Sequence, residues 1–287
     1  MKGKLLFAAA LVAAGVAGTQ AVRLANSSWN LQLLENQQLG GVNPLADDTP
    51  EAGETAELPT PLAFYDFEEE STDVTFKHLG ASTAPYSMPL SETEKGLQFT
   101  EGGSVNDLGY VQVANPFKGN AGIETAGATV SLWVCRDNGN AKALFGFGLG
   151  LEQYEDFNNS GSFGLQTDGY MPYNMYAVAK ADEFIDFNRL NNSVPIPEKT
   201  MSMVTMTIAS TGVTLYVNGT QADWGPGNHG GGELVDLYPK MLNRLKDHFT
   251  HFYVGKGGFQ GTFAGKADKL GFYDKALTAD EVKALYD

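Results

Sequence analysis

Acidic side chains are the most abundant reactive groups in this sequence, with 34 Asp and Glu against 19 Lys and Arg. Hydrolysis of a glycosidic bond uses two carboxyl groups roughly 5 to 10 Å apart. On one strand such a pair would sit at alternate positions, because every second residue shares a face. The sequence contains no Glu-x-Asp-x-x-Glu pattern, which would combine such an alternate pair with a third carboxyl group; the acidic run 68–73 lies at a strand end with a different spacing, and the run 152–156 lies in an expected loop. The chain also contains no nucleophile-elbow, zinc-protease or phosphate-loop motif, so an ordinary enzyme is disfavoured.

Aromatic and amide side chains gather in two segments that we expect to be loops. Sugars bind to aromatic faces and to amide or carboxylate groups displayed beside them. Each aromatic could instead pack beneath its own loop. The candidate carbohydrate-binding residues are Tyr170, Tyr173, Asn174, Tyr176 and Trp224.

The charge balance and the cysteine content exclude further classes of function. The formal net charge is −15, which repels phosphate backbones and argues against nucleic-acid partners. Cys135 is the only cysteine and lies in the apolar run 130–135, so we expect a buried, unreactive thiol.

Residues 1–21 have the composition of a signal peptide, with Lys2 and Lys4 before an apolar stretch and small residues at its end. The alternative is a retained N-terminal anchor, although the stretch is short for a membrane span. No cysteine lies directly after the apolar stretch, which excludes a bacterial lipoprotein. We therefore expect a secreted, periplasmic or cell-surface protein without a stable membrane span after leader removal.

Residues 22–60 are predicted to be a flexible acidic linker with a possible short helix around 29–34. The stretch 41–61 is rich in Pro, Gly, Thr and acids, and it has too little apolar surface to offset chain entropy.

From residue 61 to 287 the pattern predicts many short strands. Apolar residues alternate at Leu97 and Phe99, and again at Val130, Leu132 and Val134. Segments 201–208 and 213–217 form the strongest hairpin signal, and Asn218-Gly219 is typical of a type I′ turn. Short strands at hairpin spacing, without long helices between them, predict an all-β antiparallel sandwich.

One short helix is predicted at the C-terminus. Thr278 and Glu281 have the spacing of a capping box, and Leu277 and Val282 that of a hydrophobic staple. We expect this helix to pack against an edge of the sandwich.

The order of these segments resembles the laminin G-like, concanavalin A-like jelly-roll domains of secreted bacterial proteins. The resemblance is carried by the strands 64–67, 96–99, 109–113 and 129–134, and most specifically by 213–219, 263–268 and 272–286. It implies a structural calcium ion near the join of the first and last strands, held by Asp66 and Asp268 with a carbonyl near Gly96. Alternatively, Asp268 bonds turn backbone and Asp66 is a solvated charge.

Three functions remain compatible with the sequence. The favoured one is an exported, non-catalytic module that binds an extracellular glycan or a cell-surface protein. The second is a structural or adhesive protein without a small ligand, and the third is a divergent glycan-active enzyme.

Overall fold

The computed structural model describes residues 58–67, 73–79, 86–87, 96–99, 108–140, 142–149, 162–168, 171–180, 183–190, 194–222, 228–230, 234–256 and 261–287. The predicted signal peptide and nearly all of the predicted linker lie outside these residues. Within the described part, no helix is long and apolar enough to cross a membrane.

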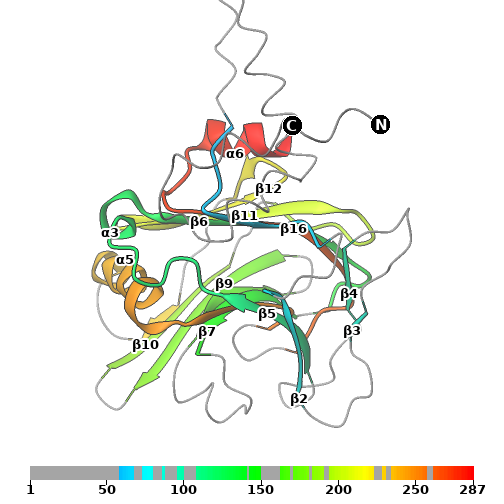
Figure 1. Cartoon of the computed structure of the whole chain (residues 1–287), viewed down its shortest axis with the longest axis horizontal. Helices are drawn as coiled ribbons and strands as arrows, with labels where there is room; N and C mark the ends of the chain where they lie inside the picture. Colours follow the sequence, from blue (N-terminus) through cyan, green and yellow to red (C-terminus); the bar gives the residue numbers. More distant parts are fainter. Residues whose placement is uncertain are drawn as a thin grey trace, which may run out of the picture. The chain divides into compact units, whose positions relative to one another are not determined.

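Two antiparallel sheets stack face to face, as predicted, and form a sandwich (Figure 1). Sheet A has the order β13-β12-β11-β6-β16-β4-β3, and β1 pairs with the same side of β16 as β4. Its strands are β1 (Ala63–Tyr65), β3 (Tyr86–Ser87), β4 (Leu97–Phe99), β6 (Ala128–Arg136), β11 (Ser202–Ala209), β12 (Gly212–Val217), β13 (Thr220–Gln221) and β16 (Gly265–Tyr273).

Sheet B has the order β14-β10-β9-β8-β7-β15-β5-β2. Its strands are β2 (Thr75–Leu79), β5 (Leu108–Ala114), β7 (Ala143–Gly148), β8 (Ser162–Asp168), β9 (Met171–Lys180), β10 (Glu183–Leu190), β14 (Asn228–Gly230) and β15 (His251–Val254). The two sheets enclose one core, because apolar residues alternate along the strands of both.

The predicted inward positions are buried. Leu97, Phe99, Val130, Leu132 and Val134 all belong to the core cluster and are at most 1% exposed. The predicted turn at Asn218-Gly219 is also confirmed, since both residues have positive φ (51° and 73°) where β12 turns into β13.

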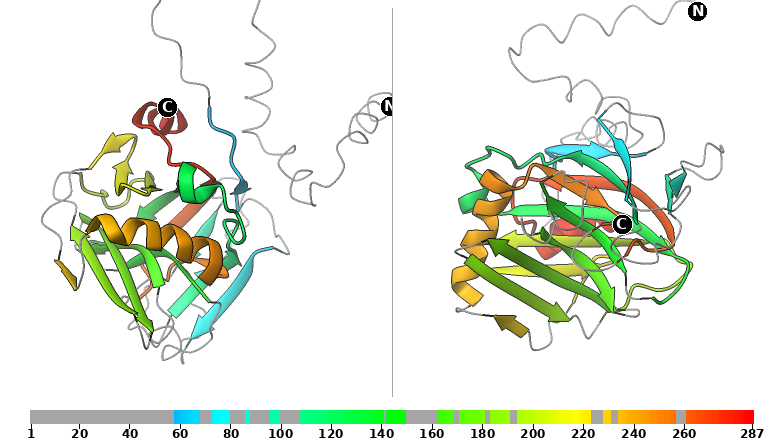
Figure 2. Two further views of the ribbon diagram at one scale, coloured as in Figure 1. Left: turned by 90° about the vertical axis from the view of Figure 1, so that its left-hand side faces the viewer. Right: turned by 90° about the horizontal axis from the view of Figure 1, so that it is seen from below.

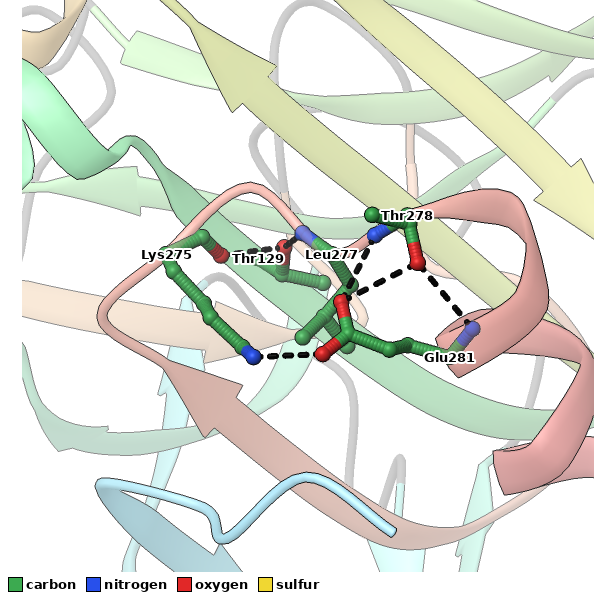
Figure 3. Close-up of polar contacts among 5 residues, drawn as sticks. All are labelled: Thr129, Lys275, Leu277, Thr278 and Glu281. Atoms are coloured by element: carbon green, nitrogen blue, oxygen red, sulfur yellow. Dashed lines mark hydrogen bonds and ion pairs between the residues drawn. The ribbon is translucent and has the colours of Figure 1, made fainter. Parts of the chain in front are cut away.

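The C-terminal helix α6 (Ala279–Tyr286) carries the predicted capping box. The Thr278 hydroxyl accepts the Glu281 N–H, and the Glu281 carboxylate accepts the Thr278 N–H (Figure 3). The preceding loop is fastened to β6: the Thr129 hydroxyl donates to the Lys275 carbonyl and accepts from the Leu277 N–H. Leu277 and Val282 are buried, as a staple requires.

Helix α6 covers the face of sheet A that points away from the core (Figure 1). The Trp133 and Tyr286 rings stack there at 5.8 Å between centroids. Cys135 on the same strand is half-buried, and burial, followed by the nearby Asp137 charge, raises the pKa of its thiol. The thiolate is therefore disfavoured, but the prediction of a buried thiol was wrong, because Cys135 is only half-buried.

One end of the sandwich is closed by helix α5 (Leu234–Asn243), which continues as a π-helix η1 (Arg244–His248) (Figure 2). Helix α5 was not among the elements predicted from the sequence. The Asn115 amide donates to the carbonyls of Leu245 (2.7 Å) and Phe249 (2.8 Å), which fixes the end of η1. The buried apolar residues that this segment adds to the core are Tyr238, Met241, Leu242, Leu245 and Phe249. A short helix, α3 (Ile123–Ala126), lies close to α5.

Candidate functional site

The face of sheet B that points away from the core presents one continuous row of residues across all eight strands. The residues on either side of Gln112, Tyr253, Gly146 and Gly164 in their strands belong to the core cluster. Alternation therefore places these four on the outer face. In strand order from β2 to β14, the register partners that make up the outer row are Thr75, Gln112, Tyr253, Gly146, Gly164, Met175, Asn188 and Asn228.

Two tyrosines and a lysine form a cluster at the β5–β15 end of this face. The Tyr110 and Tyr253 rings meet edge to face with centroids 5.4 Å apart. The Lys256 ammonium lies 4.5 Å from the Tyr110 centroid and 5.0 Å from that of Tyr253. All three residues are at most 2% exposed, yet none belongs to the core cluster between the sheets. This is a second buried cluster, on the opposite side of sheet B.

Glycines leave the middle of the outer face without side chains. Gly146 and Gly164 occupy adjacent strands of the outer row. A Cβ on Gly164 would lie 2.3 Å from the Phe145 carbonyl oxygen, and one on Gly148 would lie 2.7 Å from the Tyr253 ring. Such distances exclude any larger residue without movement. The result is a stretch of backbone without side chains beside the tyrosine cluster, and Gly146, Gly148 and Gly164 are themselves buried.

Polar groups lie at the same end of the face. Gln112, opposite Tyr253, is half-buried, and its side-chain oxygen is shielded from solvent with no hydrogen-bond donor among the described residues. Burial lowers the pKa of Lys256 to about 8, because desolvation disfavours the ammonium form. Aromatic rings, an amide and a cation beside a flat backbone surface match the chemistry by which proteins hold polar ligands such as sugars.

The predicted carbohydrate-binding residues are not displayed on one loop. The interpretation of 170–176 as a loop was wrong from residue 171 onward, because Met171–Lys180 forms β9. Position 173 pairs with Gln166, whereas positions 174 and 176 pair with Leu165 and Phe163, which are core residues. Tyr173 therefore shares the outer face, while Asn174 and Tyr176 occupy core-side positions of the strand. Tyr170 and Trp224 lie outside the described residues.

The predicted calcium ligands Asp66 and Asp268 lie at the same corner of sheet A. Asp66 follows β1, whose last residue, Tyr65, pairs with Leu270 of β16. Asp268 begins the β-bulge of β16, and a Cβ built on Gly96 would lie 3.4 Å from the Asp268 Cβ. Three residues at this corner have positive φ, namely Phe67 (52°), Gly96 (102°) and Lys269 (45°). Strained backbone of this kind gathers at ligand sites.

The donor set fits a calcium ion in part. Two carboxylates are present, and calcium would need backbone carbonyls and water besides them. One Asp268 oxygen already accepts the Lys269 N–H at 2.8 Å, as the alternative interpretation expected. Among the described residues, no group of three or more His, Cys, Asp or Glu is arranged to hold a metal.

The outer-face residues around Gln112, Tyr253 and Lys256 were not among the sequence candidates. One signal was available, since Gly146 and Gly148 alternate with Phe145 and Phe147, which indicates a strand with one apolar face and one bare face. No local signal could show that Gln112 lies opposite Tyr253, because the pairing joins segments about 140 residues apart in the sequence.

Sequence and structure comparisons agree with this architecture. The family model described as the concanavalin A-like lectin/glucanases superfamily matches residues 106–283. No curated protein shows significant sequence similarity to the chain.

Among solved structures, domain 4 of an extracellular GH43 arabinanase from Geobacillus stearothermophilus, in complex with arabinotriose, is similar to this chain. It has a TM-score of 0.50 and 16% identity over 80% of this chain and 100% of that domain. A Trypanosoma rangeli sialidase in complex with the inhibitor DANA gives a TM-score of 0.51 and 18% identity. The match covers 92% of this chain but only 38% of the sialidase.

At these identities the structural matches establish the fold. The family match covers more than half of the sequence, and its residues include every strand from β5 to β16 and most of α6, but not β1 to β4. The chain is therefore a member of the concanavalin A-like lectin/glucanase superfamily.

Proposed function

We propose that this protein is an exported, non-catalytic carbohydrate-binding module whose ligand lies across the outer face of sheet B. The observation that carries the proposal is the outer row itself. It combines the Tyr253 ring, the Gln112 amide and the bare backbone at Gly146 and Gly164 on adjacent strands. A pyranose or furanose ring needs this combination of a flat floor, an aromatic wall and an amide hydrogen-bond partner.

Further observations bear on the proposed binding role. None of the eight positions of the outer row is Asp or Glu, but Asp168 and Asp186 occupy other outer-face positions of β8 and β10, so this face does not lack the carboxyl groups that hydrolysis of a glycosidic bond uses. Tyr173 joins the site as an outer-face residue of β9, next to the row. The arabinanase domain with the same fold is in complex with arabinotriose, which supports a saccharide as the ligand class.

The alternative is a structural or adhesive protein that contacts a cell-surface protein and holds no small ligand. The shielded side-chain oxygen of Gln112 favours a ligand, because it meets no donor among the described residues and a buried acceptor without a donor is costly. A glycan hydroxyl would satisfy it.

A glycan array probed with the full chain tests the proposal. We expect binding to at least one glycan, and we expect Gln112→Leu to weaken it about tenfold or more, because the variant removes one hydrogen-bonding group. Gln98→Leu is the matched control, since Gln98 is a half-buried amide in β4 of sheet A. If the protein bound none of the glycans, the proposed carbohydrate-binding function would be refuted and the structural or adhesive alternative would remain.

We also propose that a calcium ion stabilises the corner of sheet A formed by Asp66, Asp268 and Gly96. The ion would join β1 to the bulge of β16 through the two carboxylates, and Gly96 would supply its backbone carbonyl. Its role would be to hold the strand ends together, on a different sheet from the proposed glycan face.

A further inference from the structure

We propose that helix α6 is a detachable cover on sheet A, which leaves the sheet and returns as a unit while both sheets stay folded. The hinge is the step from Leu277 to Thr278, and opening uncovers the ring of Trp133. The cover lies on the opposite sheet from the proposed glycan face, so this inference does not depend on the proposed function.

The helix lies along the outer side of β6. At one end, Thr129 bonds the Lys275 carbonyl (2.7 Å) and the Leu277 N–H (3.0 Å) of the preceding loop (Figure 3). At the other end, the Tyr286 ring stacks on that of Trp133. Four residues of strand and nine residues of helix each span about 14 Å, so the two contacts on β6 match the length of α6.

The apolar residues that hold α6 are separate from the main core. The helix buries Val282 (0% exposed) and Leu285 (4%), yet neither belongs to the core cluster between the two sheets. That core therefore stays complete when the helix leaves. Detachment removes the burial of these two side chains and the Trp133–Tyr286 stack.

The loop and the helix are attached in different ways. Besides the two bonds of Thr129 to the loop, the Ala276 N–H donates to the Ala126 carbonyl at 2.7 Å. Within the part of the chain that the structure describes, no hydrogen bond joins Ala279–Tyr286 to either sheet. The loop is thus a fixed tether, and side-chain packing alone holds the helix that follows it.

The sheet beside the helix can accept water. Ser131 lies between Thr129 and Trp133 on the outer side of β6, and its hydroxyl bonds that of Thr205 on β11 at 2.9 Å. Both hydroxyls keep this partner when the helix leaves, so opening leaves neither of them unsatisfied. Antiparallel sheets commonly have one solvated face, which means that sheet A does not need the cover to stay folded.

The helix should unwind as it leaves. An isolated helix of about eight residues is unstable in water, because so short a segment cannot offset the cost of nucleation. Its amide hydrogens therefore become exchangeable together in the open state, and hydrogen exchange can measure the opening.

Native-state hydrogen exchange of the full chain tests the proposal. We expect the amides from Val282 to Tyr286 to share one protection factor, about a hundredfold or more below that of the central amides of β6, because small units open at a fraction of the global free energy. Low concentrations of urea should change the protection of α6 with a smaller slope than that of β6, because opening exposes less surface than unfolding.

A core variant in the other sheet separates opening from unfolding. Val113→Ala removes apolar volume at β5, where Val113 is 2% exposed, and should lower the protection of β6 by about tenfold or more while that of α6 stays unchanged. Ala114→Ser, at the exposed neighbour in the same strand, is the matched control and should change neither.

Two results would overturn the proposal. If α6 and β6 lost protection equally in Val113→Ala, or had equal urea slopes in the wild type, the helix would open only when the sheets unfold. If protection fell steadily from Val282 to Tyr286, the helix would fray from its end instead of leaving as a unit. The urea slopes of the wild type decide the first point even if Val113→Ala does not fold.

Discussion

The Tyr253 ring lies directly over the backbone of Gly148 on the neighbouring strand of sheet B. A methyl group added to Gly148 would come within 2.7 Å of Tyr253 Cε2 and 3.1 Å of its hydroxyl oxygen. The ring therefore depends on this glycine for its place between the bare backbone and Lys256. Disturbing one residue should disturb the whole proposed glycan face.

Gly148→Ala is predicted to destabilise the fold by about 1 to 3 kcal/mol, the usual cost of overpacking, and to weaken glycan binding. The added methyl group must displace the Tyr253 ring and, through it, the Lys256 ammonium. Denaturant unfolding and calorimetric titration measure the two effects. Gly212→Ala is the control, because a Cβ there meets no atom within 4 Å. Equal stability of the two variants would show that the contact is not tight.

Lys256 should make the stability of the protein depend on alkaline pH. Its folded pKa of about 8 lies below the ordinary 10.5, so between these values the unfolded chain binds more protons than the folded one. The contribution of Lys256 to the free energy of unfolding therefore rises with pH across this window, by about 3 kcal/mol at most.

Other groups titrate in the same range, so the prediction concerns the difference in the free energy of unfolding between the wild type and Lys256→Met. Burial raises the pKa values of Cys135, Tyr216 and Tyr273, which lowers stability at high pH in wild type and variant alike. We expect Lys256→Met to be the more stable protein at pH 7. Its advantage in the free energy of unfolding over the wild type should become smaller toward pH 10, as measured by denaturant unfolding. A difference in the free energy of unfolding that does not change with pH would contradict the burial of a charged amine.

Thr278→Ala is predicted to cost about 1 kcal/mol, because α6 loses the hydroxyl that accepts the Glu281 N–H. Thr278→Ser keeps that oxygen and should remain within a few tenths of a kcal/mol of wild type. Chemical denaturation of both variants measures the effect. If the alanine variant were as stable as the serine variant, the capping box would not contribute to the fold.

Calcium should raise the melting temperature of the full chain relative to the same protein in EGTA, since a ligand of the native state must stabilise it. Asp268→Asn and Asp66→Asn should each reduce the rise in melting temperature that calcium causes. Asp137→Asn is the comparison, because Asp137 follows β6 and is exposed. Identical melting curves with calcium and with EGTA would refute the calcium site.

The parts of the fold that sequence could predict depend on local patterns. Alternation identified the core side of β6, and the Asn218-Gly219 pair identified the turn into β13, because each signal lies within a few residues. Both residues of the α6 capping box, Thr278 and Glu281, were predicted for the same reason.

Helix α5 was missed although its signal was present. Tyr238, Met241, Leu242 and Leu245 have the spacing of an apolar helix face, but Pro239 within them is typical of loops. The proposed glycan face could not be predicted at all. It depends on the register of strands distant in sequence, and the sequence candidates from 173 to 176 fall on alternate faces of β9.

The most direct test of the proposed function is an NMR titration of the full chain with the tightest-binding saccharide found on the array. Backbone amide shifts are followed for Gln112, Gly146, Gly148, Gly164 and Tyr253 on the outer face of sheet B. The same is done for Thr129, Thr205 and Thr214 of sheet A as a reference. We predict saturable shifts in the first group with the second unchanged. Shifts confined to sheet A, or none with any saccharide, would contradict the account.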